Sequence, residues 1–359
     1  MIVFILPDLK GGGAQRVVIN LVIGLKSMGA NVEIIVFNKI GELTSYIPEN
    51  IIIHNLSSKS LSKSIFPLIK KIKLINPQIV FSTFGYINIG LLLCRLFIPR
   101  SVKIWIREAN LPSISLPNNS YTFLISNGYK LLYPYADKLF CTSQRMTDEF
   151  HKDFKLSISN MQILPNPVND KMIQLNIEDF TNYDNNKVNF ISMGRLTYQK
   201  GFDRLLLWLS NMESKEFILR IIGNGPMEQE LKDLVKKLNL SRQVIFLGYM
   251  DNPWSLIAAS DAFLLPSRWE GMPNAALESL VCGTPVIATS ESGGIKELNK
   301  SLKQGAVIVT SSEYEFCEEM KKIKYKNNKD NKTCLLPQKY CLDNVLEVFN
   351  DQLKAEISE

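Results

Sequence analysis

Pro266-Ser-Arg-Trp-Glu-Gly-Met-Pro-Asn-Ala-Ala-Leu-Glu278 is the stretch that decides the fold. It follows a short apolar run, Ala262 to Leu265, which predicts a buried strand. Pro273 suits the first position of a helix, because its missing N–H would be unpaired there in any case. Met272 would then be the N-cap, and it has no side-chain oxygen to accept a hydrogen bond from the first turn.

The start of this helix is therefore predicted to bind an anion. The first-turn amides of Asn274, Ala275 and Ala276 are expected to be free at the positive end of the helix dipole, which suits a phosphate. Glu270 precedes the helix, and Glu278 lies in its second turn. Because a carboxylate repels a phosphate, we expect both to accept hydrogen bonds from nearby hydroxyl groups, such as those of a sugar.

Size and composition fit a globular α/β protein of two domains. The chain has 359 residues, of which 46% are hydrophobic. No apolar run reaches the roughly 18 residues of a membrane-spanning helix, and Met1 to Leu6 predict a first strand rather than a signal peptide. The six cysteines form neither a CxxC pair nor a zinc-like spacing with the two histidines. This usage is typical of reduced cysteines, so we expect a cytoplasmic protein without a metal site.

The positive charge is concentrated in the first half. Residues 1–168 carry 18 Lys and Arg against 9 Asp and Glu, whereas the remainder carries 23 against 26. A basic first half indicates an anionic surface or substrate. No recognised nucleic-acid motif or aromatic platform accompanies the charge, which argues against nucleic acid as a partner.

Residues 60–75 form a basic amphipathic stretch within this half, with apolar residues at helical spacing between lysines. One interpretation is a crossover helix with a solvated lysine face. The other is an interfacial helix that rests on anionic lipid, a peripheral contact with the inner face of the cell membrane. Pro67 interrupts the pattern and argues against one long helix.

The first half begins as a doubly wound parallel sheet does. A strand, Ile2 to Leu6, is followed by a glycine loop at 11–13 and by a helix from about Ala14. The loop is either a phosphate-binding turn or simply a tight turn, and it lacks the GxGxxG spacing of an NAD site. Further along, Ser143 is expected to cap the helix that follows a strand at 138–142.

The same pattern restarts in the second half. Leu164-Pro-Asn-Pro-Val168 breaks regular structure, and a strand at Val188 to Ser192 begins a second series. We therefore expect one domain of residues 1–165, completed by a C-terminal helix at 340–359, and a second domain of residues 166–339. Glycine-bearing turns end several strands, and right-handed crossovers bring these ends to one edge of the sheet.

Five motifs in this order resemble those of the GT-B glycosyltransferases of family 4, which are retaining nucleotide-sugar enzymes. They are the glycine loop at 11–13, Gly194-Arg-Leu…Lys200-Gly201, the two glutamates at 270 and 278 with seven residues between them, Cys282-Gly-Thr-Pro-Val286, and Ser292-Gly-Gly294. The resemblance covers nearly the whole chain and is strongest from 188 to 297. It implies two doubly wound Rossmann-like domains that face a central crevice.

The resemblance also implies the reaction. A hexose or N-acetylhexosamine would pass with retention from a nucleotide sugar, expected to be UDP-linked, to a hydroxyl of a growing surface glycan such as a polysaccharide, an O-antigen or lipopolysaccharide. A polyprenyl-linked acceptor is expected from the basic first domain. No cofactor is implied, since the nucleotide sugar is a substrate. No Asp-x-Asp occurs in the chain, which favours a metal-independent reaction.

Site residues follow from the same motifs. Arg195 and Lys200 correspond to the pair that grips the donor diphosphate, although as isolated residues they could be surface charges. Glu278 would accept hydrogen bonds from the ribose, and Glu270 would lie at the transferred sugar and reaction centre. Backbone contacts to diphosphate or sugar are implied for Met272, Asn274, Ala275, Gly12 and Gly13. The base pocket is implied for Gly223, Tyr249 and Met250, with plain packing as the alternative for the last two.

One position departs from the family pattern. Many relatives place a histidine at a strand end that corresponds to Ala109, and here Glu108 and Asn110 flank the alanine. Either is a candidate contact for the sugar or the acceptor, and Asn110 could instead cap the next turn. Two rival functions remain open: a GT-B epimerase or nucleotide-sugar hydrolase, and a non-catalytic partner subunit that binds nucleotide only.

Overall fold

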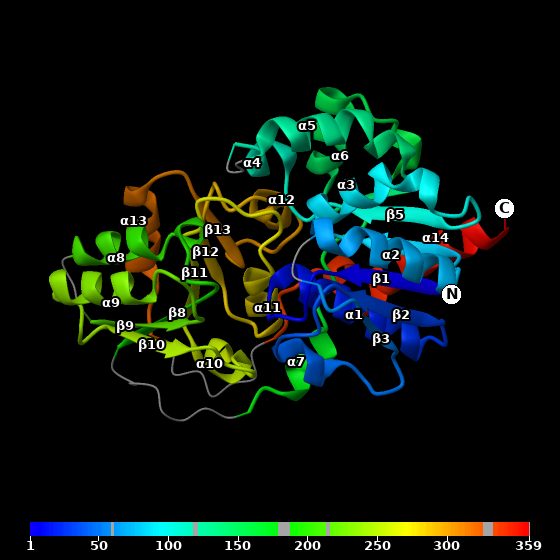
Figure 1. The fold of residues 1–359 in the computed structure, drawn as a ribbon. Helices are drawn as coiled ribbons and strands as arrows, with labels where there is room; N and C mark the ends of the chain where they lie inside the picture. Colours follow the sequence, from blue (N-terminus) through cyan, green and yellow to red (C-terminus); the bar gives the residue numbers. More distant parts are fainter. Residues whose placement is uncertain (59–60, 118–120, 179–186, 213–215, 326–332, 359) are drawn as a thin grey trace. The chain divides into compact units, whose positions relative to one another are not determined.

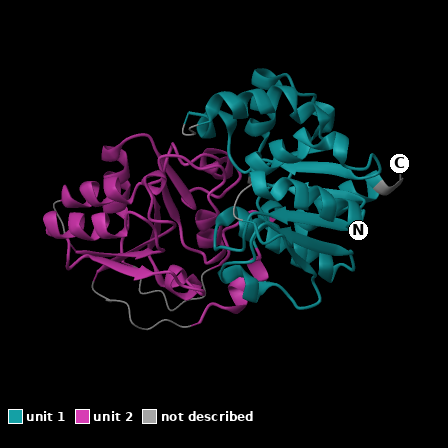
Figure 2. Ribbon diagram, viewed as in Figure 1, with its two compact units in different colours: residues 1–168, 339–359 teal, residues 169–338 magenta. Residues whose placement is uncertain are grey.

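A computed structural model of the chain describes residues 1–58, 61–117, 121–178, 187–212, 216–325 and 333–358. It divides into two compact units, residues 1–168 with 339–359 and residues 169–338 (Figure 2). The division thus falls after Val168 rather than after Pro165. Each unit contains its own parallel sheet with helices on both faces, the arrangement expected from the sequence (Figure 1).

The first unit is built on a seven-stranded sheet in the order β3-β2-β1-β4-β5-β6-β7, and every pairing is parallel. Its central strands are short apolar runs that are buried on both faces, as parallel sheets require. The strands are β1 (Ile2–Leu6), β2 (Val32–Val36), β3 (Ile53–Asn55), β4 (Ile79–Ser82), β5 (Lys103–Arg107), β6 (Lys138–Cys141) and β7 (Met161–Ile163).

Helices form one hydrophobic core on each face of this sheet. The core on one face contains residues of α1 (Gly13–Ser27) and the C-terminal α14 (Leu342–Ser358), whose Phe349 stacks on Phe140 with ring centroids 5.6 Å apart. The other core is covered by α2 (Leu61–Ile75), α3 (Gly85–Leu93), α5 (Thr122–Leu131) and α6 (Gln144–Phe154). Shorter elements are η1 (Glu42–Tyr46), η2 (Arg95–Phe97), α4 (Pro112–Ser115), η3 (Tyr133–Tyr135), η4 (Ile158–Asn160) and η6 (Gln338–Tyr340).

Pro67 does not break the basic helix, so the expectation of an interruption there was wrong. Helix α2 runs from Leu61 to Ile75 with Pro67 inside it. Leu68 and Ile72 are buried against the sheet, whereas Pro67 is exposed. The carbonyl that loses its partner therefore lies on the solvent side, where water can satisfy it. Residues 59 and 60 lie outside the described residues.

The second unit contains a six-stranded parallel sheet in the order β10-β9-β8-β11-β12-β13. Its strands are β8 (Val188–Met193), β9 (Phe217–Ile222), β10 (Val244–Gly248), β11 (Ala262–Leu265), β12 (Val286–Thr289) and β13 (Val307–Thr310). The helical elements are α7 (Asp170–Leu175), η5 (Tyr198–Lys200), α8 (Phe202–Ser210), α9 (Glu228–Lys237), α10 (Trp254–Ala259), α11 (Asn274–Val281), α12 (Ile295–Lys300) and α13 (Glu313–Lys322).

Two glycines allow the loops at the carboxyl edge of this second sheet to approach one another closely. Gly223 has φ 130°, and a Cβ added there would lie 2.0 Å from the carbonyl oxygen of Gly194. Gly293 has φ 62°, and a Cβ there would lie 2.0 Å from the carbonyl oxygen of Glu270. Only glycine fits either position. These close approaches hold the loops together at the carboxyl edge of the second sheet.

All six cysteines carry free thiols. Within the described ranges, no helix is both long enough and apolar enough to cross a membrane.

Candidate functional site

The loop after β11 leads into α11 through Pro273. The proline is the N-cap, with ψ 98°, and the helix begins at Asn274, one residue later than expected. An extended backbone at Pro273 turns its carbonyl toward the helix, where it accepts from the amide of Ala276 at 3.0 Å. The expectation that Ala276 offers a free amide was therefore wrong. The amide of Ala275 donates to no described residue, and no side chain caps the helix, so Ala275 keeps a donor at the positive helix end.

Glu270 is the most constrained carboxylate of the site. It is 6% exposed. Its Oε1 accepts from the Lys200 ammonium at 2.5 Å and from the Ser267 hydroxyl at 2.8 Å. Oε2 has no donor among the residues that the structure describes. Glu270 thus holds Lys200 in place and keeps one oxygen for a hydroxyl group.

Arg195 and Lys200 both follow β8, on the loop that ends in η5. Arg195 is exposed, and its guanidinium makes no hydrogen bond or ion pair with a described residue. Lys200 is held by Glu270, with a side chain that is 21% exposed. Of these two cations, Arg195 has no partner among the described residues, and Lys200 is oriented by a carboxylate.

Glu278 faces a partner that the sequence did not indicate. Its Oε2 accepts a hydrogen bond from the indole Nε1 of Trp254 at 3.0 Å, and the carboxylate is 6% exposed. Trp254 opens α10, and its own amide donates to the Asn252 side chain. No sequence signal indicated this pair, whose members are 24 residues apart. Trp254 fixes the direction of the Glu278 carboxylate.

The remaining expected residues of this unit lie at neighbouring strand ends. Gly223 follows β9, and its amide donates to the carbonyl of Gly248 at the end of β10. Tyr249, which follows β10 directly, is 38% exposed, and Met250 is partly buried. Met272 is 6% exposed, next to the N-cap of α11. The loops after β8, β9, β10 and β11 supply the predicted residues of the second unit, except for Asn274, Ala275 and Glu278, which lie in α11.

In the first unit, the glycine loop is largely occupied by its own turn. The amide of Gly12 donates to the carbonyl of Lys10 at 2.8 Å, and that of Gly11 donates to the Glu42 carboxylate at 3.2 Å. Gly12 is the N-cap of α1, which begins at Gly13. The turn therefore uses the Gly12 amide, and the expected approach of Gly12 and Gly13 to the diphosphate or sugar stays a prediction.

Glu108 is buried about as deeply as Glu270, and its contact with a ligand stays a prediction. It is 5% exposed, and its Oε1 accepts from the Asn88 amide at 3.0 Å and from the Tyr133 hydroxyl. Burial raises the pKa of Glu108 to about 7, although the Tyr133 and Asn88 bonds and the charge of Arg107 favour the ionised form. Apolar side chains around this strand end enclose the carboxylate.

Asn110 is exposed, two residues beyond Glu108. The next helix, α4, has Leu111 as its N-cap and no side-chain cap, so Asn110 does not cap it. Its side chain remains a candidate for a ligand contact.

A metal site would need several ligating side chains gathered in one group. In the described parts of the chain, no three His, Cys, Asp or Glu side chains gather into such a group. Metal independence remains a prediction.

Comparison with known families divides the chain in the same way as the structure does. The family described as "Glycosyl transferases group 1" matches residues 174–334, and the family described as "Glycosyltransferase Family 4" matches residues 11–171. Each match therefore falls almost entirely on one of the two units.

Among curated proteins, an uncharacterized glycosyltransferase of Methanocaldococcus jannaschii is 31% identical over 70% of this chain and 66% of that protein. A second relative, from Campylobacter jejuni, is 28% identical over 85% of each chain. Its name is N-acetylgalactosamine-N,N'-diacetylbacillosaminyl-diphospho-undecaprenol 4-alpha-N-acetylgalactosaminyltransferase.

Solved structures share the fold over nearly the whole chain. The Anabaena protein HepE in complex with UDP-glucose matches with a TM-score of 0.79 at 15% identity, over 99% of each chain. The apo form of the lipopolysaccharide outer core galactosyltransferase WaaB matches with a TM-score of 0.71 at 19% identity, also over 99% of each. Each unit has a parallel sheet and is matched by one of these two glycosyltransferase families, which confirms the resemblance. The chain belongs to the GT-B glycosyltransferases of the group 1, family 4 type.

Proposed function

We propose that this protein transfers a hexose or an N-acetylhexosamine from a UDP-sugar to a hydroxyl of a growing surface glycan, with retention and without a metal ion. The observation that carries the proposal is the Lys200–Glu270 pair, joined at 2.5 Å. The relatives support the chemistry. The Campylobacter jejuni enzyme is named for an N-acetylgalactosaminyl transfer to an undecaprenol diphosphate, and WaaB is named for lipopolysaccharide.

The residues of the second unit suit a donor of this kind. Arg195 and Lys200 offset the charge of the diphosphate, and the amide of Ala275 adds a donor at the positive end of α11. Glu278, oriented by Trp254, accepts from the ribose hydroxyls. Glu270 offers Oε2 to a hydroxyl of the transferred sugar.

The reaction then depends on the leaving group. The bond between the sugar's anomeric carbon and the diphosphate oxygen breaks as the acceptor oxygen bonds to that carbon from the same face. The acceptor proton passes to the departing phosphate oxygen. Negative charge develops on the diphosphate, so Arg195, Lys200 and the Ala275 amide supply the main stabilisation of the transition state.

Incubation with a set of UDP-sugars and a polyprenyl-diphosphate-linked glycan tests this proposal. We expect UDP release that depends on the acceptor, together with a glycan one sugar longer. Glu270→Gln should lower this turnover at least about 100-fold. Lys232→Met, which removes an exposed ion pair with Glu228, is the matched control and should retain activity.

Other outcomes identify the rival functions. UDP release without an acceptor would indicate a hydrolase, and interconversion of the donor sugar would indicate an epimerase. Binding of UDP without turnover of any donor and acceptor pair would refute the transferase and favour a nucleotide-binding partner subunit.

A membrane contact is part of the same proposal, because a polyprenyl-linked acceptor lies at the inner face of the cell membrane. In the first unit, α2 contacts α3, and α3 contacts α5 and η2. These elements expose large apolar side chains, including Phe66 at 79%, Leu96 at 94% and Phe123 at 79%. The exposed lysines of α2 are Lys63, Lys70 and Lys73.

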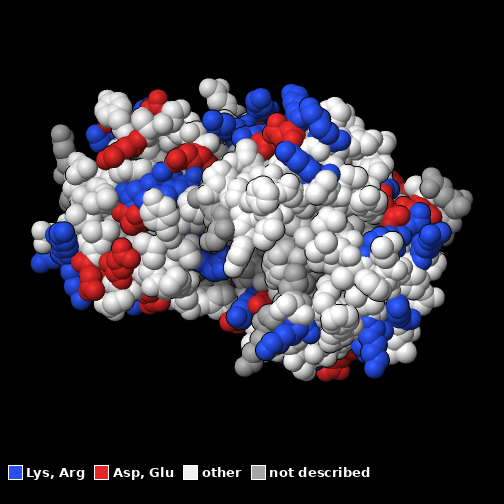
Figure 3. All heavy atoms as spheres, turned by 45° about the horizontal axis from the view of Figure 1, so that its top comes forward, with Lys and Arg blue, Asp and Glu red and all other residues white. Residues whose placement is uncertain are grey.

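The lysines suit anionic lipid headgroups, and the apolar side chains suit the interface below them. Figure 3 shows that basic and acidic side chains are interspersed over the face drawn there, so charge alone does not define the surface. Sedimentation with anionic vesicles should bring down the protein at low salt and less of it at high salt. Phe123→Ser should weaken the binding at both salt concentrations. Equal sedimentation with neutral vesicles would contradict the electrostatic part of this contact.

A further inference from the structure

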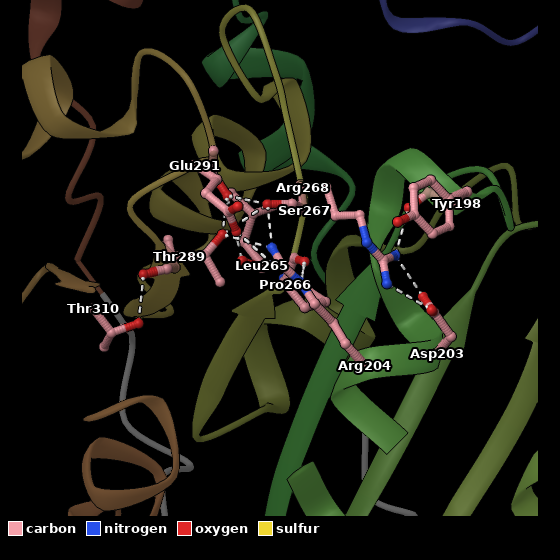
Figure 4. Close-up of polar contacts among 12 residues, drawn as sticks. Tyr198, Asp203, Arg204, Leu265, Pro266, Ser267, Arg268, Thr289, Glu291 and Thr310 are labelled. Atoms are coloured by element: carbon pink, nitrogen blue, oxygen red, sulfur yellow. Dashed lines mark hydrogen bonds and ion pairs between the residues drawn. The ribbon is translucent and has the colours of Figure 1, made fainter. Parts of the chain in front are cut away.

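Arg204 of α8 binds the loop that carries Glu270. Its Nε donates to the carbonyl of Pro266 at 2.7 Å, and its Nη2 donates to the carbonyl of Ser267 at 2.7 Å. Thr289 of β12 donates its hydroxyl to the same Ser267 carbonyl at 2.7 Å. Figure 4 shows the guanidinium directed at this loop. One planar group thus fixes two successive peptide units.

The start of α8 fits closely against the same loop. Gly201 has φ 68°, and a Cβ added there would lie 2.1 Å from the carbonyl oxygen of Pro266. Only glycine allows the approach that brings Arg204 to its two carbonyls. Lys200 precedes this glycine, so the segment that holds the loop also carries the ammonium that contacts Glu270.

A second connection holds the next residue of the loop. Arg268 forms two hydrogen bonds with the Asp203 carboxylate, both at 2.7 Å, and its guanidinium lies 3.8 Å from the centroid of the Tyr198 ring. In Figure 4, Arg268 points toward Tyr198 and Asp203, away from the Arg204 contacts. Two arginine contacts therefore fix the loop to η5 and α8.

Ser267 connects these contacts to Glu270. Its carbonyl accepts from Arg204, and its hydroxyl donates to Oε1 of Glu270 at 2.8 Å. Arg204 itself has no hydrogen bond with Glu270. We infer that Arg204 is a positioning residue that sets the Glu270 carboxylate through Ser267, an inference that rests on the proposed function for its effect on turnover.

The exposed contact of Arg204 contributes little to this role. Arg204 also pairs with Glu291, whose side chain is 54% exposed, and exposed ion pairs are weak. The two carbonyl contacts come from an Arg204 side chain that is 17% exposed. Lysine keeps the charge but cannot reach both carbonyls in one plane. Arg204→Lys therefore tests the geometry, and Glu291→Gln is the matched control.

Hydrogen exchange of the free protein tests the positioning without any substrate. We expect Arg204→Lys to speed amide exchange in peptides that cover residues 266–272 by about tenfold. Peptides from β9 should not change, and neither should any peptide in Glu291→Gln. Unchanged exchange at 266–272 would overturn the inference, whether or not the protein proves to be a transferase. If Arg204→Lys fails to fold, Thr289→Val removes another donor to the Ser267 carbonyl and should speed the same exchange.

Kinetics then test the route through Ser267. Arg204→Lys should lower kcat about tenfold or more and change the KM for the donor less than about threefold, because small misplacements of a reacting group act on the chemical step. Ser267→Ala should lower kcat similarly, and the double variant should lose little more than the worse single one. If the loss of kcat in the double variant equals the product of the two single losses, the route through Ser267 is overturned. If the wild type turns over no donor while exchange behaves as expected, the proposed function fails and the positioning stands.

Discussion

The buried carboxylate of Glu108 gives a stability prediction that requires no substrate. Glu108 lies at the end of β5, and its two hydrogen-bond donors, Asn88 and Tyr133, come from α3 and η3. Burial raises its pKa from an ordinary 4.5 to about 7. Replacement by glutamine preserves the shape of the side chain and removes the titration.

The direction in which stability changes with pH follows from proton binding by Glu108. Between pH 4.5 and about 7, folded Glu108 keeps a proton that the unfolded chain has lost. The free energy of unfolding of the first unit therefore falls as pH rises through this window and is level above it. The difference between the pKa of Glu108 in the folded and in the unfolded chain corresponds to about 3 kcal/mol in the free energy of unfolding. As the pH rises from 4.5 to 8, the free energy of unfolding of Glu108→Gln should therefore increase by about 3 kcal/mol relative to that of the wild type.

Native-state hydrogen exchange measures this difference within one unit. Amides of β5 and β6 report the unfolding of the first unit, after correction for the intrinsic exchange rate at each pH, and amides of β9 in the second unit are the internal control. Wild type and Glu108→Gln should diverge in the first unit only. Parallel pH profiles for the two proteins would refute the reasoning, because Glu108 would then titrate alike in the folded and unfolded states.

Three further predictions concern the second unit. Lys200→Met should weaken UDP-sugar binding at least about tenfold by calorimetry, because one of two diphosphate cations is lost, and an unchanged Kd would contradict that role. Trp254→Phe removes the hydrogen bond to Glu278 and should raise the Kd for UDP by about five- to tenfold, whereas an equal Kd would show that Glu278 needs no support. Gly223→Ala should lower the unfolding midpoint in urea and the affinity for UDP together, because the new Cβ meets the Gly194 carbonyl, and a normal midpoint would contradict the close approach.

Strands that consist of short apolar runs were predictable from the sequence. β1 and β11 begin and end where the sequence placed them, because a strand buried on both faces of a parallel sheet needs a continuous apolar segment. The cap at Ser143 was equally local, and its hydroxyl accepts from the amide of Met146 as expected. In contrast, β13 was not predicted, although Val307–Thr310 is a run of β-branched residues that favours a strand.

Contacts between distant segments were beyond the sequence. Trp254 and Glu278 are 24 residues apart, and no local period relates an indole to a carboxylate on another helix. The burial of Glu108 was missed for the same reason, since the enclosing Tyr133 lies 25 residues away. The motif residues of the second unit, however, do follow strands of one sheet, because parallel strands bring their carboxyl ends to one edge.

The charges of the second unit bear on how a donor would be recognised. Two cations, Arg195 and Lys200, are accompanied by two carboxylates, Glu270 and Glu278, so the net charge of the site is near zero. Attraction of any anion is therefore weak, and selection has to come from geometry. UDP alone would meet Lys200 while Glu270 still competes for that ammonium. A UDP-sugar brings a hydroxyl to Oε2 of Glu270 as well, so both members of the pair gain a partner at once. We therefore expect the intact donor to bind more tightly than its product, which favours turnover because UDP can leave.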